Sequence, residues 1–236
     1  SFMILNRLIY LIGVSSIAVG LLFGCSNTAN VGSDEIENYS AKQIYDRAEY
    51  EMARSKPIDA IAFVSDVERL YPYSEGAKRS VIMQAFANHK AKQYKEARDA
   101  AERYIEYYPA DEDSAYAQYI IALSYYDQIE DIGRDQEVTA KALQAFKKLI
   151  KNYPDSEYVK PAELKFDLAF DHLAGKEMEV GRYYLKRQQF PAAINRFRIV
   201  VEDYQTSSYT AEALHRLVEA YLSMGLVDEA QSAGAI

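Results

Sequence analysis

Apolar residues recur along the chain in one spacing, at positions i, i+4, i+7 and i+11, which places them on one stripe of an α-helix. Four segments share this pattern, and each ends in a tyrosine. They are Ala60-Val64-Val67-Tyr71, Ala97-Ala101-Tyr104-Tyr108, Ala142-Phe146-Leu149-Tyr153 and Ala193-Phe197-Val200-Tyr204. Proline follows the tyrosine in the first three, where it ends a helix because it lacks an amide donor. The pattern predicts four amphipathic helices whose stripes are buried.

A second helix is predicted upstream of each of these helices, so the repeating unit is a helix pair. A small residue marks the upstream helix, 12 positions before the leading alanine in most units. These residues are Ala48, Ala85, Gly181 and, before a fifth alanine at position 230, Val218. In the third unit Ala122 lies 20 positions before Ala142, so eight residues are inserted. The five units predict five helix pairs.

Two irregularities interrupt the repeat. The inserted residues of the third unit fall around 129–135, a charged stretch with a glycine, which predicts a long loop. Fourteen extra residues separate Pro154 from Gly181, equivalent to about four helical turns. They predict an additional or much-extended helix within 156–188, and a break near Gly175 is the alternative to a continuous one.

Capping and proline signals support these helix boundaries. Ser40 followed by Gln43 fits a capping box, in which the two side chains satisfy free amides at a helix start. Pro57 and Pro191 stand where two of the second helices begin, in the first turn that tolerates proline. The small and aromatic positions Gly181 and Phe197 resemble the tetratricopeptide repeat. The predicted fold is therefore all-α, a tetratricopeptide-repeat superhelix (α-solenoid) of about five helix pairs over 40–236.

The N-terminal region differs from the repeat. Residues 8–24 carry no charge, follow Arg7 and end at the only cysteine, Cys25. Leu22-Phe23-Gly24-Cys25 resembles the lipobox of bacterial lipoproteins, which implies a signal peptide over 1–24, lipidation of Cys25 and a flexible polar tether over 25–39. An uncleaved membrane anchor is the alternative, although 17 residues is short for a span. The last unit stops six residues after Ala230, which predicts a domain truncated at its C-terminus.

Composition and motifs argue against catalysis. The net charge is −8, so a broadly basic nucleic-acid surface is not expected. His89, His172 and His215 lack metal-ligand spacing, and no nucleophile, phosphate-loop or dinucleotide motif occurs. Acidic residues 111–113 fit a helix start. We therefore predict a protein that is not an enzyme and takes no metal or cofactor.

Candidate binding residues are aromatic or basic. In the doublets Tyr107-Tyr108, Tyr125-Tyr126 and Tyr183-Tyr184, neighbouring rings point about 100° apart, so one can fill the core while the other faces a partner. The alternative is that all pack in the core. A basic cluster in this acidic chain fits either a solvated face or a contact with an acidic partner. It consists of Lys186, Arg187, Arg196 and Arg198.

The whole chain resembles the BamD family, lipoproteins of the bacterial β-barrel assembly machine. The most distinctive segments are Leu70-Tyr71-Pro72, Gly181-Arg182-Tyr183-Tyr184 and 190–197 with its Asn195-Arg196 pair. The resemblance implies a scaffold held by its lipid at the periplasmic face of the outer membrane. Implied partners are the POTRA region of a BamA-like barrel protein, other lipoproteins of the machine and unfolded outer-membrane protein segments.

The resemblance also implies a location for partner binding. In this family the C-terminal repeats, with the arginine at the place of Arg196, couple to BamA. The predicted partner-binding residues are Arg196, Arg198, Arg187, Tyr183 and Tyr125. Two competing interpretations are another envelope adaptor that organises cell-wall enzymes, and a hydrolase with an unrecognised acidic site.

Overall fold

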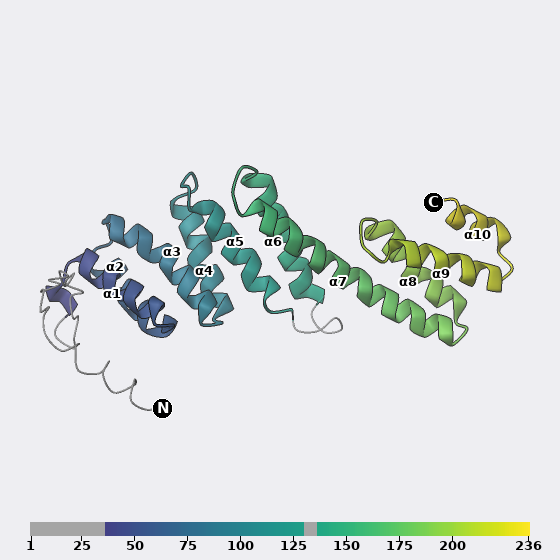
Figure 1. Ribbon diagram of the computed structural model, residues 1–236, viewed down its shortest axis with the longest axis horizontal. Helices are drawn as coiled ribbons and strands as arrows, with labels where there is room; N and C mark the ends of the chain where they lie inside the picture. Colours follow the sequence, from purple (N-terminus) through teal and green to yellow (C-terminus); the bar gives the residue numbers. More distant parts are fainter. Residues whose placement is uncertain (1–35, 130–135) are drawn as a thin grey trace, which may run out of the picture. The chain divides into compact units, whose positions relative to one another are not determined.

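The computed structural model describes residues 36–129 and 136–236, and within them the chain is helical, with ten α-helices and no strand (Figure 1). A single 3-10 turn (Ile36–Asn38) precedes the first helix. The α-helices are α1 (Ala41–Ala53), α2 (Pro57–Leu70), α3 (Glu75–Lys90), α4 (Tyr94–Tyr107), α5 (Ser114–Tyr126), α6 (Gln136–Asn152), α7 (Val159–Lys186), α8 (Phe190–Asp203), α9 (Thr210–Ser223) and α10 (Val227–Gly234). The predicted all-α stack of five helix pairs is confirmed.

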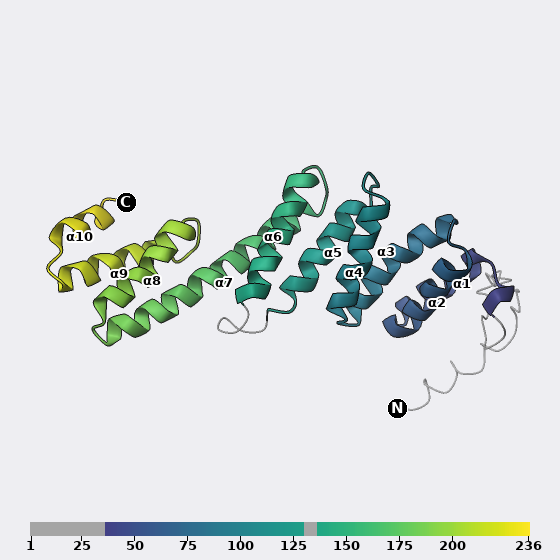
Figure 2. The same cartoon turned by 180° about the vertical axis from the view of Figure 1, so that it is seen from behind.

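Each helix packs against the next one along the chain, from α1 to α10 (Figure 2). The first helices of neighbouring pairs also touch: α1 contacts α3, α3 contacts α5 and α5 contacts α7. A single pair cannot bury its apolar face, so this nearest-neighbour packing creates the core.

The predicted stripes of α2, α4, α6 and α8 form that core. The first three members of every stripe, from Ala60 to Val200, are 0% exposed. The fourth member, a tyrosine, lies just past the helix end and is half-buried. The capping box of Ser40 and Gln43 is present, and Pro57 and Pro191 lie in first turns as predicted.

Four of the turns inside the pairs contain a residue in the left-handed region. Ser55, Lys92, Gln188 and Gly225 all have positive φ, from 59° to 73°. Each lies seven residues after the small residue of its first helix, so the repeat fixes the turn as well as the helices. Only one of the four is glycine, although the left-handed region costs other residues about 1 kcal/mol or more.

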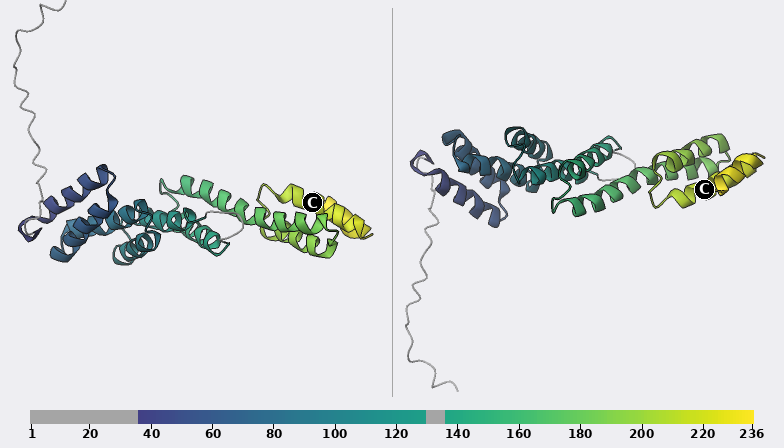
Figure 3. Two further views of the ribbon diagram at one scale, coloured as in Figure 1. Left: turned by 90° about the horizontal axis from the view of Figure 1, so that it is seen from below. Right: turned by 90° about the horizontal axis from the view of Figure 1, so that it is seen from above.

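The extra residues of the fourth unit lengthen one helix. α7 has 28 residues and is continuous through Gly175, so the predicted extension is confirmed and the alternative of a break near this glycine is wrong (Figure 3). Gly175 has a packing role instead, because a Cβ there would lie 3.2 Å from the ring of Tyr209. Of the predicted loop at 129–135, only Ile129 belongs to the described residues.

Most of the buried apolar residues fall into three clusters. The first joins α1 and α2, the second runs from α3 to the start of α7, and the third joins the rest of α7 to α8, α9 and α10. α7 takes part in two clusters, with Ala162 in the second and Ala174 and Met178 in the third. We call these the first, middle and C-terminal clusters.

Candidate partner-binding surfaces

The hairpin of α7 and α8 carries four of the five partner-binding residues that the sequence predicts. Glycine at position 181 lets the two helices approach, because a Cβ there would lie only 2.5 Å from Cε1 of the fully buried Phe197. The close fit fixes the positions of both helices. It therefore sets where Tyr183, Arg187, Arg196 and Arg198 lie.

Arg196 bridges the two helices of this hairpin. Its Nη1 donates a hydrogen bond to Oε2 of Glu177 on α7 at 3.0 Å. The side chain of Glu177 is 13% exposed and that of Arg196 is 41% exposed, so the pair is partly shielded from water. Arg196 therefore braces α8 against α7 while part of its side chain stays accessible.

The other two arginines also contact neighbouring side chains. Arg198 donates from Nε at 2.9 Å and Nη2 at 2.7 Å to Oε1 of Glu202, one turn along α8. These hydrogen bonds raise the pKa of the Arg198 guanidinium. Arg187, which caps α7, lies with Cζ 4.6 Å from the centre of the Tyr183 ring, and Tyr183 is exposed. The basic cluster is therefore partly neutralised by carboxylates, and it presents an arginine stacked on an exposed tyrosine.

The tyrosine doublets divide between core and surface in two of three cases. Tyr107 is exposed beside a half-buried Tyr108, and Tyr183 is exposed beside Tyr184, which packs against the C-terminal cluster. These two doublets therefore place one ring against a buried cluster and leave the other exposed, and binding of a partner by the exposed ring stays a prediction. Both rings of Tyr125-Tyr126 are half-buried and pack against the middle cluster.

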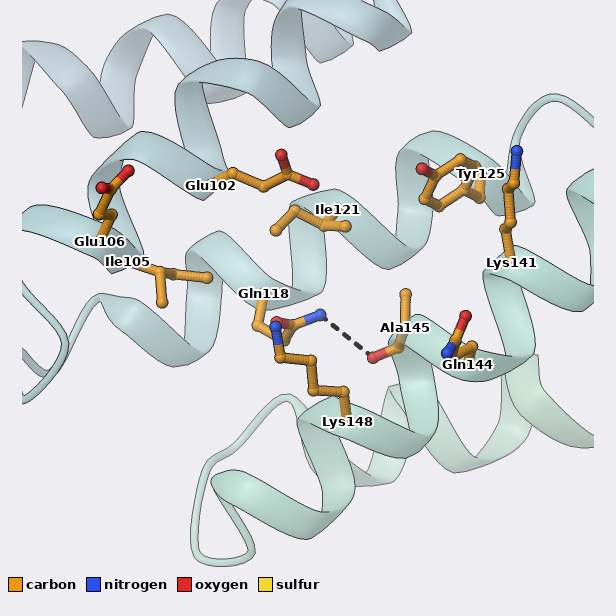
Figure 4. Close-up of a pocket in the computed structure, with 10 residues that line it drawn as sticks. All are labelled: Glu102, Ile105, Glu106, Gln118, Ile121, Tyr125, Lys141, Gln144, Ala145 and Lys148. Atoms are coloured by element: carbon orange, nitrogen blue, oxygen red, sulfur yellow. Dashed lines mark hydrogen bonds between the residues drawn. The ribbon is translucent and has the colours of Figure 1, made fainter.

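Tyr125 is not brought together with the other four residues. It lies on α5, in a pocket between α4 and α6 with a volume of about 510 Å³ (Figure 4). Arg98 of α4 places its Cζ 4.2 Å from the centre of the Tyr125 ring. The residues that line this α4–α6 pocket are Glu102, Ile105, Glu106, Gln118, Ile121, Tyr125, Lys141, Gln144, Ala145 and Lys148.

The pocket contains a buried amide that the sequence analysis missed. Gln118 is 1% exposed, and its Nε2 donates to the carbonyl oxygen of Ala145 at 3.2 Å. Its Oε1 accepts no hydrogen bond from any residue in the described ranges. A signal was present, because Gln118 is an amide within an otherwise apolar part of α5, four positions before Ala122. Glu177 occupies the same place, four positions before Gly181.

An ion pair between α7 and α9 was also missed. Arg182 binds Glu212 with Nε at 2.9 Å and Nη2 at 2.5 Å, and the bond lowers the pKa of Glu212. The sequence gives little indication of this pair, because the two residues are 30 positions apart. The pair ties first helices of neighbouring units together beside the α7–α8 hairpin.

A third polar contact joins α3, α4 and the turn before α5. The carboxylate of Asp111 accepts a hydrogen bond from the hydroxyl of the fully buried Tyr104 at 2.6 Å and forms an ion pair with Lys78. It also accepts from the backbone amide of Asp113 at 3.0 Å, next to the helix start expected for this acidic stretch. Lys78 and Tyr104 lower the pKa of Asp111 to about 2, and burial raises the pKa of Tyr104.

Some predictions cannot be examined in the structure. Cys25, the signal peptide over 1–24 and nearly all of the tether lie outside the described residues. Among the residues that are described, no three histidine, cysteine, aspartate or glutamate side chains gather as a metal site would require. In the same residues, none of the helices has both the length and the apolar character needed to span a bilayer.

Comparison with known proteins identifies the family. A family model described as YfiO, outer membrane lipoprotein, matches residues 37–235. This chain belongs to that family. The match covers every α-helix of the described fold, and the resemblance to the BamD family found in the sequence is confirmed.

Relatives of this YfiO-family chain carry the name outer membrane protein assembly factor BamD. The protein of Caulobacter vibrioides is 42% identical over 213 residues, which are 90% of this chain and 70% of the relative. That of Rickettsia prowazekii is 45% identical over 161 residues, 68% of this chain and 64% of the relative. That of Neisseria meningitidis serogroup A is 29% identical over 223 residues, 89% of this chain and 84% of the relative.

Proposed function

We propose that this chain is a non-enzymatic adaptor in the assembly of outer-membrane proteins. The observation that carries the proposal is its 42% identity, over 90% of its length, to a protein named as an outer membrane protein assembly factor. Relatives named as assembly factors favour this role over the organisation of cell-wall enzymes and over hydrolysis. A stack of helix pairs suits an adaptor, because it offers an extended surface for binding without chemistry.

The proposed principal partner is the POTRA region of a BamA-like barrel protein, bound by the fourth and fifth helix pairs. Arg196 supports this assignment, because its side chain is 41% exposed although it is bonded to Glu177. Arginine can hold a carboxylate through parallel hydrogen bonds, so it could serve the hairpin and a partner together. Other lipoproteins of the machine and unfolded outer-membrane protein segments are the further proposed partners.

Calorimetric titration tests the partner and the role of Arg196 together. The chain from residue 26 onward is titrated with the purified POTRA region from the same organism, as wild type, Arg196→Gln and Glu177→Gln. We expect Arg196→Gln to weaken binding by about 2 kcal/mol, or about 30-fold, because a charged contact is lost. Glu177→Gln removes the same internal ion pair but leaves the arginine available, so its affinity should stay within about threefold of wild type.

Melting temperatures of the same variants separate binding from bracing. If Arg196 only holds α8 against α7, both substitutions lower the melting temperature equally and leave the affinity unchanged. For the melting temperature alone, Arg198→Gln is the matched control and should leave it nearly unchanged, because its partner Glu202 lies on the same helix and both side chains are more than half exposed. The absence of any binding by the wild-type chain would refute the proposed partner itself.

We further propose that Cys25 carries the lipid that anchors the chain at the periplasmic face of the outer membrane. The lipobox supports this assignment, as does the match to a family described as outer membrane lipoproteins. In cells, Cys25→Ser should abolish incorporation of labelled palmitate and release the chain from the outer-membrane fraction, because several acyl chains are needed for stable anchoring. Continued outer-membrane fractionation of a processed Cys25→Ser chain would contradict the anchor.

A further inference from the structure

The walls of the α4–α6 pocket have opposite charges. Glu102 and Glu106 come from α4, while Lys141 and Lys148 come from α6, and α5 lies between them (Figure 4). Lys141 is bound to Glu137, but Glu102, Glu106 and Lys148 form no ion pair within the described part of the chain. Ile105, Ile121 and Ala145 make the rest of the lining apolar, and Oε1 of Gln118 is buried there without a partner among the described residues.

At the equivalent place two helices earlier, the polar side chains of the chain bond to one another. Between α2 and α4, Nη2 of Arg103 donates to Oε2 of Glu68 at 3.1 Å and to Oε1 of Gln84 at 3.0 Å. Gln84 in turn donates to Glu68 at 2.8 Å. Carboxylate, amide and cation therefore bond to one another there, although Nε of Arg103 has no partner among the described residues. In the α4–α6 pocket, Ile105 stands in the register position of Glu68, so the corresponding network cannot form.

The equivalent place at the C-terminal end shows that the fold does not require an amide at this position. A pocket of about 490 Å³ lies between α8 and α10, and all of its lining residues except Asp228 stand at the same repeat positions as those of the α4–α6 pocket. Leu214 stands there in the place of Gln118, and Ile236 in the place of Lys148. A buried carbonyl oxygen without a donor is destabilising, which makes Gln118 a candidate for a role beyond its bond to Ala145.

We propose that the α4–α6 pocket binds an extended segment of a partner protein in which a basic residue and an acidic residue are adjacent. Neighbouring side chains of an extended chain point to opposite sides, which directs the basic one to Glu102 on α4 and the acidic one to Lys148 on α6. Oε1 of Gln118 is buried in the unbound chain, so binding turns this side chain and lets a main-chain amide of the segment donate to Oε1. The remaining apolar surface covers Ile105 and Ile121.

The dimensions and donor chemistry favour a peptide over other occupants. A volume of about 510 Å³ lies within the usual range of binding pockets. The unpaired group is an acceptor, and main-chain amides are the donors that every extended segment supplies. Charges of both signs on facing walls disfavour a simple anion or a nucleic acid strand. This site goes beyond the proposed function and does not depend on the docking of a POTRA region at α7 and α8.

The test uses the acetylated and amidated hexapeptide Ser-Val-Arg-Glu-Val-Ser, followed by NMR on the labelled chain. We expect saturable shifts of the Gln118 side-chain amide and of backbone amides in α4, α5 and α6, at peptide concentrations near 1 mM. Replacing the peptide arginine by citrulline, which has the same shape without the charge, should weaken binding by about two- to fivefold. In the Glu102→Gln chain, the arginine and citrulline peptides should bind equally well. In the Lys148→Gln chain, the original peptide and one with glutamine in place of its glutamate should bind equally well.

Matched substitutions complete the design. Glu96→Gln, on exposed α4 surface outside the pocket, should leave affinity and citrulline sensitivity unchanged. Gln118→Leu, which introduces the residue of the C-terminal pocket, should fold with an unchanged or higher melting temperature and lose about tenfold or more in affinity. Three results would overturn the proposal: no shifts in the pocket, citrulline sensitivity that survives Glu102→Gln, or a lower melting temperature of Gln118→Leu with unchanged affinity. The exposed Glu102 keeps the test decisive if Gln118→Leu fails to fold.

Discussion

Asp111 links three elements through one carboxylate. Lys78 reaches it from α3, the Tyr104 hydroxyl from α4, and the backbone amide of Asp113 from the start of α5. Tyr104 is fully buried, so its hydroxyl needs an acceptor, and a charged acceptor binds it more strongly than a neutral one. The contact holds the turn after Pro109 against the core and thereby positions α5, which provides the floor of the α4–α6 pocket.

The pKa of Asp111 predicts how this contact depends on pH. The folded value of about 2 lies below the ordinary 3.8, so the carboxylate stabilises the fold above about pH 4 and loses that contribution as the pH falls toward 2. Asp111→Asn should cost about 1–2 kcal/mol at neutral pH and reduce the loss of stability between pH 4 and 2. Urea unfolding across this pH range measures both effects. Asp99→Asn, which breaks an exposed pair with Lys95, is the control and should change stability by less than about 0.5 kcal/mol.

At the scale of elements, the sequence predicts most of the helices because each boundary has a local cause. The stripes from Ala60 to Val200 are buried as predicted, and the prolines after the terminal tyrosines lie where helices have ended. The left-handed turn residues were not predicted, since Ser55, Lys92 and Gln188 carry no glycine signal. Their shared register follows from the length of the helix pair and not from residue type.

Long-range contacts explain what the sequence could not predict. Gly175 suggested a helix break, but it admits the Tyr209 ring from more than 30 residues away. Arg196 belongs to the basic cluster, and no feature of the neighbouring sequence indicates that it bonds to Glu177 on the preceding helix. Gln118 is recognisable as a polar residue in an apolar helix, yet its unpaired oxygen depends on how α4 and α6 approach it. The sequence therefore indicated which kinds of residue could form the candidate sites, but not which other residues each of them contacts.

At the scale of the whole described chain, stability is divided among the three buried clusters. Each is built from successive helices, and contacts are mainly between neighbours in sequence. The free energy of unfolding of such a repeat protein is close to the sum of the stabilities of its units and of the interfaces between neighbours. One part can therefore unfold while the others stay folded. α7 couples the middle cluster to the C-terminal one, because it contributes buried residues to both.

This division predicts that core substitutions have local effects. Phe197→Ala in the C-terminal cluster and Phe146→Ala in the middle cluster each remove a fully buried ring, at a cost of about 3–5 kcal/mol. With Phe197→Ala, amide hydrogens of α8 and α9 should exchange about 100-fold faster or more, while α1 to α4 keep their protection. Phe146→Ala should instead accelerate exchange in α5 and α6. If exchange also rises more in α7 than in α3, α7 is the helix that couples the middle and C-terminal clusters. Exchange that rises equally in all helices after Phe197→Ala would show one cooperative unit, and a docking surface on α7 and α8 would then depend on the stability of the first helix pair.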